Sequence, residues 1–180
     1  MLWILIACFD KAQDTAVERT EPTDEIVPED DLSWVDPADL PAGENPCRDP
    51  VRVQVNYVVD GDTFFANYGQ EKVRIIGIDT PEMNDGECYA QEAKTFLTQL
   101  INGKWVWLTF DKECSDVYDR TLAYVHLGPM EMDFVERQLL RGGYAQAFPF
   151  DDTNTFEELF AADEMAARDG NNGGWGSCGW

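Results

Sequence analysis

Residues 51–79 read VRVQVNYVVDGDTFFANYGQEKVRIIGID and contain the clearest pattern of secondary structure in the chain. The first nine residues alternate apolar and polar side chains and are rich in valine, which predicts a β-strand. Asp60–Gly61 is a turn dipeptide, so a returning strand is expected over 63–68. A further turn leads to a third strand over 72–78, which is apolar apart from Arg74. The segment therefore predicts three consecutive strands joined by tight turns.

The rest of the chain adds further strands and helices around this segment. Two more strands are expected at 104–110 and 120–127, and helices are expected at 89–101, 133–140 and 155–168. Apolar residues at helical spacing mark each helix. Thr155 and Glu158 have the spacing of a capping box at the start of the last helix. Periodicity alone thus predicts an α+β domain with about five strands and about three helices.

Three short blocks concentrate acids and arginines within one segment. They are DGDT at 60–63, VRIIGIDTPE at 73–82 and DVYDR at 116–120. Carboxylates bind hard divalent cations, and arginines pair with phosphate oxygens. An arginine inside an apolar strand must project toward a polar cleft, because its burial would otherwise be costly. A site that holds both groups has what phosphodiester cleavage requires.

Together these blocks resemble the staphylococcal nuclease (thermonuclease) family. The resemblance implies a five-stranded barrel of the OB type and calcium-dependent hydrolysis of phosphodiester bonds in DNA, RNA or both, by metal-assisted attack of water. It implies that Ca²⁺ is held by the carboxylates of Asp62 and Asp79 and by the carbonyl of Thr80. The alternative interpretation is that the two aspartates only form turns.

The same resemblance assigns the catalytic groups. Glu82 would be the general base, and Arg74 and Arg120 would bind the phosphate and stabilise its extra negative charge. As an alternative, Arg120 would simply pair with Asp116 or Asp119 at the surface, where such pairs are common.

Several residues near the third block depart from the family pattern. Tyr118 matches a position that binds a terminal phosphate of the substrate, but Val117 replaces a basic residue and Asp119 replaces a glycine. Asp119 can adopt left-handed torsion angles, so we expect the turn to survive. Phe148 is expected to be a second ring near the substrate base. These departures affect substrate affinity and preference.

The charge balance is unusual for a protein that acts on nucleic acids. The chain has 35 acidic and 13 basic residues, a net charge of -22, and residues 51–180 retain 22 acids against 10 bases. This excludes a general nucleic-acid coating protein, which would be basic. It does not exclude a nuclease, because remote charges are screened over about 8 Å at physiological salt.

The N-terminal region predicts export. Residues 1–8, MLWILIAC, have the pattern of a lipoprotein signal ending at Cys8, whose lipid would attach the protein to a membrane. The stretch is too short to span a bilayer and lacks basic residues, so a merely apolar N-terminus is the alternative. Residues 9–46 are acidic and rich in proline and threonine, which predicts a disordered linker. The folded domain is then expected at 47–180.

The four remaining cysteines predict disulfides in an extracytoplasmic protein. Four cysteines allow three connectivities, and we expect Cys47–Cys178 and Cys88–Cys114. Four reduced thiols in a cytosolic protein are the alternative, and no CxxC spacing indicates zinc. The single histidine, His126, is expected at the surface or rim.

The sequence thus predicts a monomeric, extracytoplasmic nuclease, either secreted or tethered to the cell envelope, that requires calcium. The alternative function is a non-catalytic OB-type module that binds nucleic acid or another ligand at the cell surface. A calcium-stabilised structural domain is a third possibility, but it has no need of Arg74, Glu82 and Arg120. The preference for DNA or RNA and for endo or exo cleavage stays open.

Overall fold

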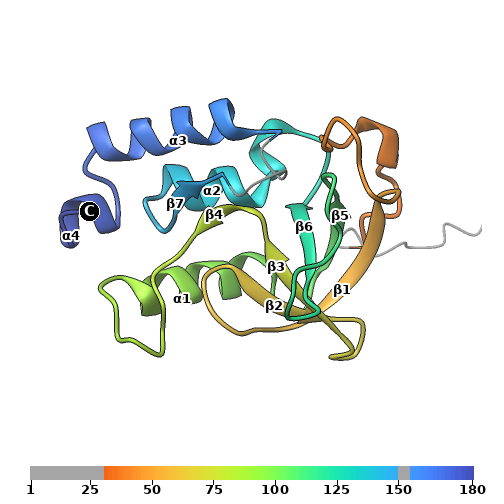
Figure 1. Cartoon of the computed structure of the whole chain (residues 1–180), viewed down its shortest axis with the longest axis horizontal. Helices are drawn as coiled ribbons and strands as arrows, with labels where there is room; N and C mark the ends of the chain where they lie inside the picture. The colour runs from red at the N-terminus through yellow and green to blue at the C-terminus, as the bar shows by residue number, and fades with distance from the viewer. Residues whose placement is uncertain (1–30, 150–154) are drawn as a thin grey trace, which may run out of the picture.

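The computed structural model describes residues 31–149 and 155–180, and its centre is a closed five-stranded barrel (Figure 1). The strands run in the order β1-β2-β3-β6-β5, and β5 pairs with β1 to close the barrel. All pairs are antiparallel except β3 with β6. The bounds are β1 Val51–Val58, β2 Thr63–Ala66, β3 Glu71–Ile75, β5 Trp105–Thr109 and β6 Thr121–His126. The predicted α+β fold with a five-stranded barrel is confirmed.

Alternation along the strands fills the barrel interior. One set of alternate residues points inward and is completely or almost completely buried, and it includes Val53, Val55, Phe64, Ala66, Val73, Ile75, Val106 and Leu108. Burying each large aliphatic or aromatic side chain contributes about 1.5–3 kcal/mol. The other set points out of the barrel, and the site residues on β2 and β3 belong to it.

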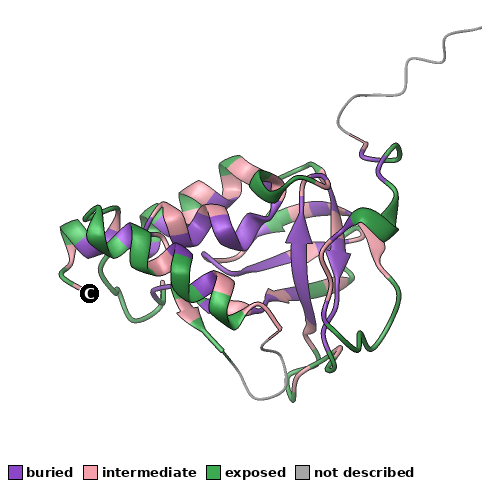
Figure 2. Ribbon diagram, turned by 90° about the horizontal axis from the view of Figure 1, so that it is seen from above, coloured by how far each residue is buried: buried purple, intermediate pink, exposed green. Residues whose placement is uncertain are grey.

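Helices cover one side of the barrel, where Figure 2 shows the buried face of α2 next to buried strands. The helices are α1 Ala90–Ile101, α2 Val135–Arg141, α3 Glu157–Asp169 and the short α4 Gly174–Ser177, with 3-10 turns at Pro37–Asp39 and Glu131–Asp133. The predicted capping box does not form. Thr155 makes no cap on α3, and its hydroxyl instead accepts a hydrogen bond from the backbone N–H of Glu44.

The predicted third strand is divided in two at Gly77. This residue has φ +79°, and a Cβ there would lie 2.4 Å from the ring of Phe160. Only glycine combines this torsion with so close an approach. The chain therefore turns from β3 into β4 (Gly77–Asp79), which pairs with β7 (Gln146–Phe148). This turn directs Asp79 and Thr80 back toward the start of β2.

The segment 31–46, for which the composition predicts a disordered linker, is ordered against the barrel. Leu32, Val35 and Leu40 are buried and pack against Trp107. The indole N–H of Trp107 donates to the carbonyl of Leu32 at 3.1 Å. Few apolar residues are enough here because the barrel supplies the surface that they cover.

The predicted signal at 1–8, with Cys8, and the linker up to residue 30 lie outside the described residues. Among the residues that the structure does describe, no helix is long and apolar enough to cross a membrane.

Both predicted disulfide pairings are wrong, although all four cysteines are paired. The bonds are Cys47–Cys114 and Cys88–Cys178, with Cα atoms 5.7 and 5.9 Å apart. The backbone N–H of Cys47 donates to the carbonyl of Asp111 at 2.8 Å, so the chain enters the fold beside the loop after β5. The C-terminal residues instead lie against the loop before α1. The sequence gives the number of cysteines but not which loops are neighbours.

His126 is buried, contrary to the expected surface position. It is 1% exposed, and its Nε2 lies 2.9 Å from the hydroxyl of Thr109. That hydroxyl donates to the carbonyl of Pro41, so it accepts from an Nε2–H of the neutral ring. Burial lowers the pKa of His126 to about 3. The residue is therefore an uncharged part of the core that joins the N-terminal segment to β5 and β6.

Candidate active site

The buried carboxylate of Asp62 is the centre of the site. One of its oxygens accepts from the backbone N–H and the hydroxyl of Thr80, at 3.1 and 2.8 Å, and the other accepts from the hydroxyl of Thr63 at 3.0 Å. Gly61 permits this approach, because a Cβ there would lie 2.6 Å from the Thr80 hydroxyl. The β1–β2 turn and the end of β4 are thereby joined, although they are far apart along the chain.

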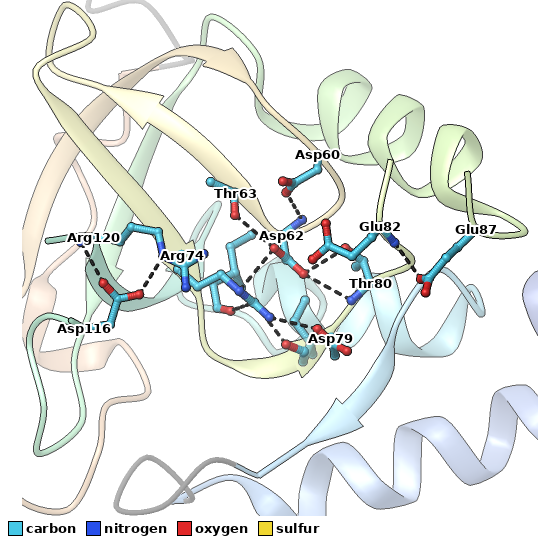
Figure 3. Close-up of polar contacts among 12 residues, drawn as sticks. Asp60, Asp62, Thr63, Arg74, Asp79, Thr80, Glu82, Glu87, Asp116 and Arg120 are labelled. Carbon is cyan, nitrogen blue, oxygen red and sulfur yellow. Dashed lines mark hydrogen bonds and ion pairs between the residues drawn. The ribbon is translucent and has the colours of Figure 1, made fainter. Parts of the chain in front are cut away.

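Arg74 projects from β3 into the same cluster, as Figure 3 shows. Its Nε lies 3.2 Å from Asp62, and one terminal nitrogen lies 3.1 Å from Asp79. The other terminal nitrogen donates to the carbonyl of Ile78 at 3.1 Å. The arginine in an apolar strand thus points toward a polar cleft, as its chemistry predicts.

Two carboxyl groups of this cluster have raised pKa values. Burial, followed by repulsion from Asp62, raises the pKa of Asp60. Burial also raises the pKa of Asp79, where the nearby charge of Arg74 opposes the shift and the charge of Asp62 adds to it. Repulsion among these carboxylates thus adds to the effect of burial, and Arg74 opposes the shift only in part at Asp79.

Glu82 lies beyond Pro81, at the edge of this cluster. Its backbone N–H donates to the carboxylate of Glu87 at 2.8 Å, which holds the loop in place while the Glu82 carboxylate is left exposed. Partial desolvation, then repulsion from Asp62 and the neighbouring aspartates, raises the pKa of Glu82, and Arg74 opposes this shift. A carboxylate with a raised pKa is better suited to accept a proton.

Arg120 forms the ion pair that the alternative interpretation expects. Its Nε lies 2.6 Å from Asp116, whose other oxygen accepts from the backbone N–H groups of Tyr118 and Arg120. Burial acts to raise the pKa of Asp116, but these hydrogen bonds and the guanidinium outweigh it, and the pKa is lowered. Asp119 has φ +64°, so the left-handed turn expected in place of glycine is present.

Both arginines also line one pocket, so the ion pair does not remove Arg120 from the site. The pocket has a volume of about 790 Å³ and is bordered by Arg74, Arg120, Tyr118 and Phe148. Its lining also includes the apolar residues Ile76, Ile78 and Leu122 and the disulfide residue Cys114. A lining that combines apolar side chains with two guanidinium groups suits a ligand that has both a flat ring and a phosphate.

The structure thus brings together residues from three separated blocks. Direct contacts join Asp62, Asp79, Thr80 and Arg74. The charges of this group alter the pKa of Glu82. Arg120 lines the same pocket as Arg74. Sequence reasoning missed Asp60 and Glu87. Asp60 belongs to the DGDT block and was interpreted only as a turn former, whereas no local pattern marks Glu87 as the partner of the Glu82 backbone.

The fold and this cluster define an OB-type domain with a carboxylate–arginine site at the ends of β2, β3 and β4. Residues 72–177 match the family described as Staphylococcal nuclease homologue, and the chain belongs to that family.

Two similar proteins are thermonucleases of staphylococci. The chain is 38% identical to the thermonuclease of Staphylococcus intermedius over 99 residues, which are 52% of this chain and 57% of that protein. It is 36% identical to the thermonuclease of Staphylococcus hyicus over 96 residues, 50% of this chain and 55% of that protein. The chain thus spans just over half the length of these two relatives.

An uncharacterized protein of Methanocaldococcus jannaschii is 31% identical over 146 residues, 66% of this chain and 68% of that protein.

Proposed function

We propose that this protein hydrolyses phosphodiester bonds of nucleic acids with the help of calcium. The observation that carries the proposal is the convergence of Asp62, Asp79 and Glu82 on Arg74, beside a pocket that Arg120 also lines. A structural domain would need the acids for its metal, but it would not need two arginines at the pocket wall. Membership of the nuclease family supports the same conclusion.

The donor chemistry fits calcium. The cluster presents hard carboxylate oxygens, which Ca²⁺ prefers, and a bound cation would offset the repulsion that Asp62 exerts on Asp60 and Asp79. Among the described residues, no group of three or more acidic, histidine or cysteine side chains is placed to hold a metal ion. The calcium shell that we infer uses only two carboxylates, those of Asp62 and Asp79, with the carbonyl of Thr80 as a further oxygen ligand.

When bound, calcium would place positive charge beside the phosphate and a water molecule. The residues of this chain supply the rest. Glu82 orients the attacking water and accepts its proton, since its carboxylate is exposed at the edge of the cluster and has a raised pKa. Arg74 and Arg120 bind the phosphate oxygens and stabilise the charge that develops on them.

The remaining properties follow from the surroundings of the site. The acidic surface repels a polyanion, so we infer weak capture of substrate and low non-specific affinity. Tyr118 is well exposed at the rim of the pocket, where it would contact a phosphate of the substrate.

Two disulfides are typical of oxidising compartments, which supports a location outside the cytoplasm. Attachment through Cys8 and a monomeric state are further proposals that rest on the sequence.

The test is digestion of single-stranded DNA by the purified chain with calcium and then with excess chelator. Cleavage that requires calcium, and that is lost in Asp62→Asn, supports the proposal. Cleavage that persists in chelator would contradict the calcium dependence. If a folded protein binds DNA but does not cleave it under any condition, the non-catalytic binding module is the correct function.

A further inference from the structure

The outer face of the barrel carries a row of two aromatic rings and a lysine next to the site. Tyr57 on β1 pairs with Phe65 on β2, and Phe65 pairs with Lys72 on β3. The two rings stack with their centroids 4.8 Å apart, and the ammonium of Lys72 lies over the Phe65 ring at 5.9 Å from its centroid. We call these three residues the outer row.

The outer row and the site lie on the same face of the same strands. Residues that alternate along a strand share a face, so Lys72 lies on the side of β3 that carries Arg74, and Phe65 lies on the side of β2 that carries Thr63. Thr63 and Arg74 are themselves directly paired. The outer row is therefore the next row of the sheet, about 7 Å from the site along the strands. That spacing is on the scale of one nucleotide of an extended strand.

The Tyr57 ring is exposed to solvent, and its stacking on Phe65 holds it in place. Half of the surface of Tyr57 is accessible, whereas Phe65 is partly buried beneath the stack. Because Phe65 already fixes the orientation of the Tyr57 ring, a base that stacks on Tyr57 has little side-chain entropy to remove. Exposing a large apolar ring to water is unfavourable unless the ring binds a ligand.

The charge of Lys72 is available in an otherwise acidic protein. The neighbouring carboxylate of Glu71 accepts from Arg48, Asn67 and Thr121. Within the described part of the chain, Lys72 itself forms no ion pair. The outer row therefore combines stacked rings with an ammonium group that has no carboxylate partner among the described residues, and rings with a nearby cation are the combination that binds unpaired bases and their phosphates.

We propose that the outer row is an additional subsite that binds the single-stranded nucleic acid flanking the bond to be cleaved. Tyr57 stacks on an unpaired base, Phe65 supports its ring, and Lys72 contacts the phosphate next to that base. The subsite recognises an unpaired base, because a base inside a duplex has no free face for Tyr57. The role of the subsite in cleavage rests on the proposed nuclease function, but binding to the subsite can be measured without cleavage.

The experiment compares two labelled probes with each variant. One is a thymidine dinucleotide, and the other is an oligothymidylate of about ten nucleotides, the size of an OB-type site. Binding is followed by fluorescence anisotropy with calcium in a Glu82→Gln background, which keeps the probe intact, and cleavage is followed separately in the otherwise native chain.

Tyr57→Ala is expected to weaken binding of the longer probe by about fivefold to a hundredfold, the effect of losing one stacked base. Binding of the dinucleotide should change little. Tyr57→Phe keeps the ring and should bind both probes as the parent does. Lys72→Gln should weaken binding of the longer probe and reduce the dependence of its affinity on salt. Trp34→Ala removes another exposed ring, outside the outer row, and should have no effect.

Equal loss for both probes, no loss in Tyr57→Ala, or equal loss in Trp34→Ala would overturn the subsite. Thermal unfolding of each variant shows whether it is folded, and Lys72→Gln tests the row even if Tyr57→Ala is unstable. If the longer probe binds through Tyr57 but the native chain cleaves neither probe, the subsite stands and the nuclease proposal fails. If both probes are cleaved with the same dependence on Tyr57, the nuclease stands and the subsite fails.

Discussion

The guanidinium Nε of Arg74 lies 3.2 Å from the buried carboxylate of Asp62. This pair joins the DGDT block to the VRIIGIDTPE block, which the antiparallel pairing of β2 with β3 places side by side. The same guanidinium reaches Asp79 at 3.1 Å, so a single cation holds two acids that would otherwise repel. The arginine therefore has two tasks in this site, which are to balance the acids and to face the pocket where a phosphate would bind.

The first prediction separates these two tasks of Arg74. Glu82 must be deprotonated to accept a proton, so activity should rise with pH through its pKa. Arg74 lowers that pKa against the effects of desolvation and neighbouring acids. Arg74→Gln should therefore move the acid limb of the pH–activity profile to higher pH, whereas Arg74→Lys keeps the charge and should leave the limb in place.

Both Arg74 variants should also lose about 10²–10³ in kcat, because neither can replace all the contacts of the guanidinium. The measurement is kcat as a function of pH. An acid limb at the same pH in wild type and Arg74→Gln would contradict the electrostatic coupling.

The second prediction concerns Glu82. Glu82→Gln should reduce turnover by about 10²–10⁴, the usual effect of removing a positioned base. Its folding should not suffer. A raised pKa means that the charged form is disfavoured in the fold, so this carboxylate costs stability as pH rises above its ordinary pKa, and the amide removes that cost.

Single-turnover cleavage and urea unfolding measure the two effects of Glu82→Gln. Glu92→Gln, an exposed carboxylate on α1, is the matched control for turnover and should leave it unchanged. Near-native turnover by Glu82→Gln would remove Glu82 as the base.

The third prediction uses the two disulfides as controls for each other. Each closes a loop of similar length, with separations of 67 and 90 residues, so removing either pair should cost about 4–5 kcal/mol in the chain-entropy model. Their effects on activity should differ. Cys114 borders the pocket, so loss of Cys47–Cys114 should mainly raise KM, whereas loss of Cys88–Cys178 loosens the loop that carries Glu82 and should mainly lower kcat.

Paired serine variants, Cys47→Ser with Cys114→Ser and Cys88→Ser with Cys178→Ser, allow this comparison by urea unfolding and steady-state kinetics. The same kinetic change in both pairs would show that the bonds act only through global stability.

The fourth prediction is a pH dependence of stability that arises from His126. Its pKa is lowered to about 3 in the fold by burial, whereas the unfolded chain protonates it near pH 6.5. The unfolded state therefore binds the proton first, and stability is lost as the pH falls below about 6.5. Between about pH 7 and about pH 5 this histidine should cost about 2 kcal/mol.

His126→Gln keeps a polar group beside Thr109 and should lack this part of the pH dependence. The difference between wild type and variant in urea unfolding isolates the histidine, because buried Glu136 is present in both. An equal loss of stability on acidification in the two proteins would place the histidine in contact with water.

The five barrel strands, the first helix and the blocks that carry chemistry can all be predicted from the amino-acid sequence. Alternation over 51–75 predicts which side chains fill the barrel, because burial of one face of a strand is a local pattern. The identity of Arg74 inside an apolar run predicts a polar cleft for the same local reason. The left-handed turn at Asp119 also follows from the residue that occupies it.

Which segments of the chain lie in contact could be seen only in the folded protein. The disulfides pair Cys47 with Cys114 and Cys88 with Cys178, because the chain enters beside the β5–β6 loop and leaves beside the loop before α1. The burial of His126 and the ordering of 31–46 have the same origin, since each depends on a partner far away along the chain. Periodicity reports how one residue faces its neighbours in sequence. Contacts between distant segments depend on how the whole barrel closes, and no local pattern contains that information.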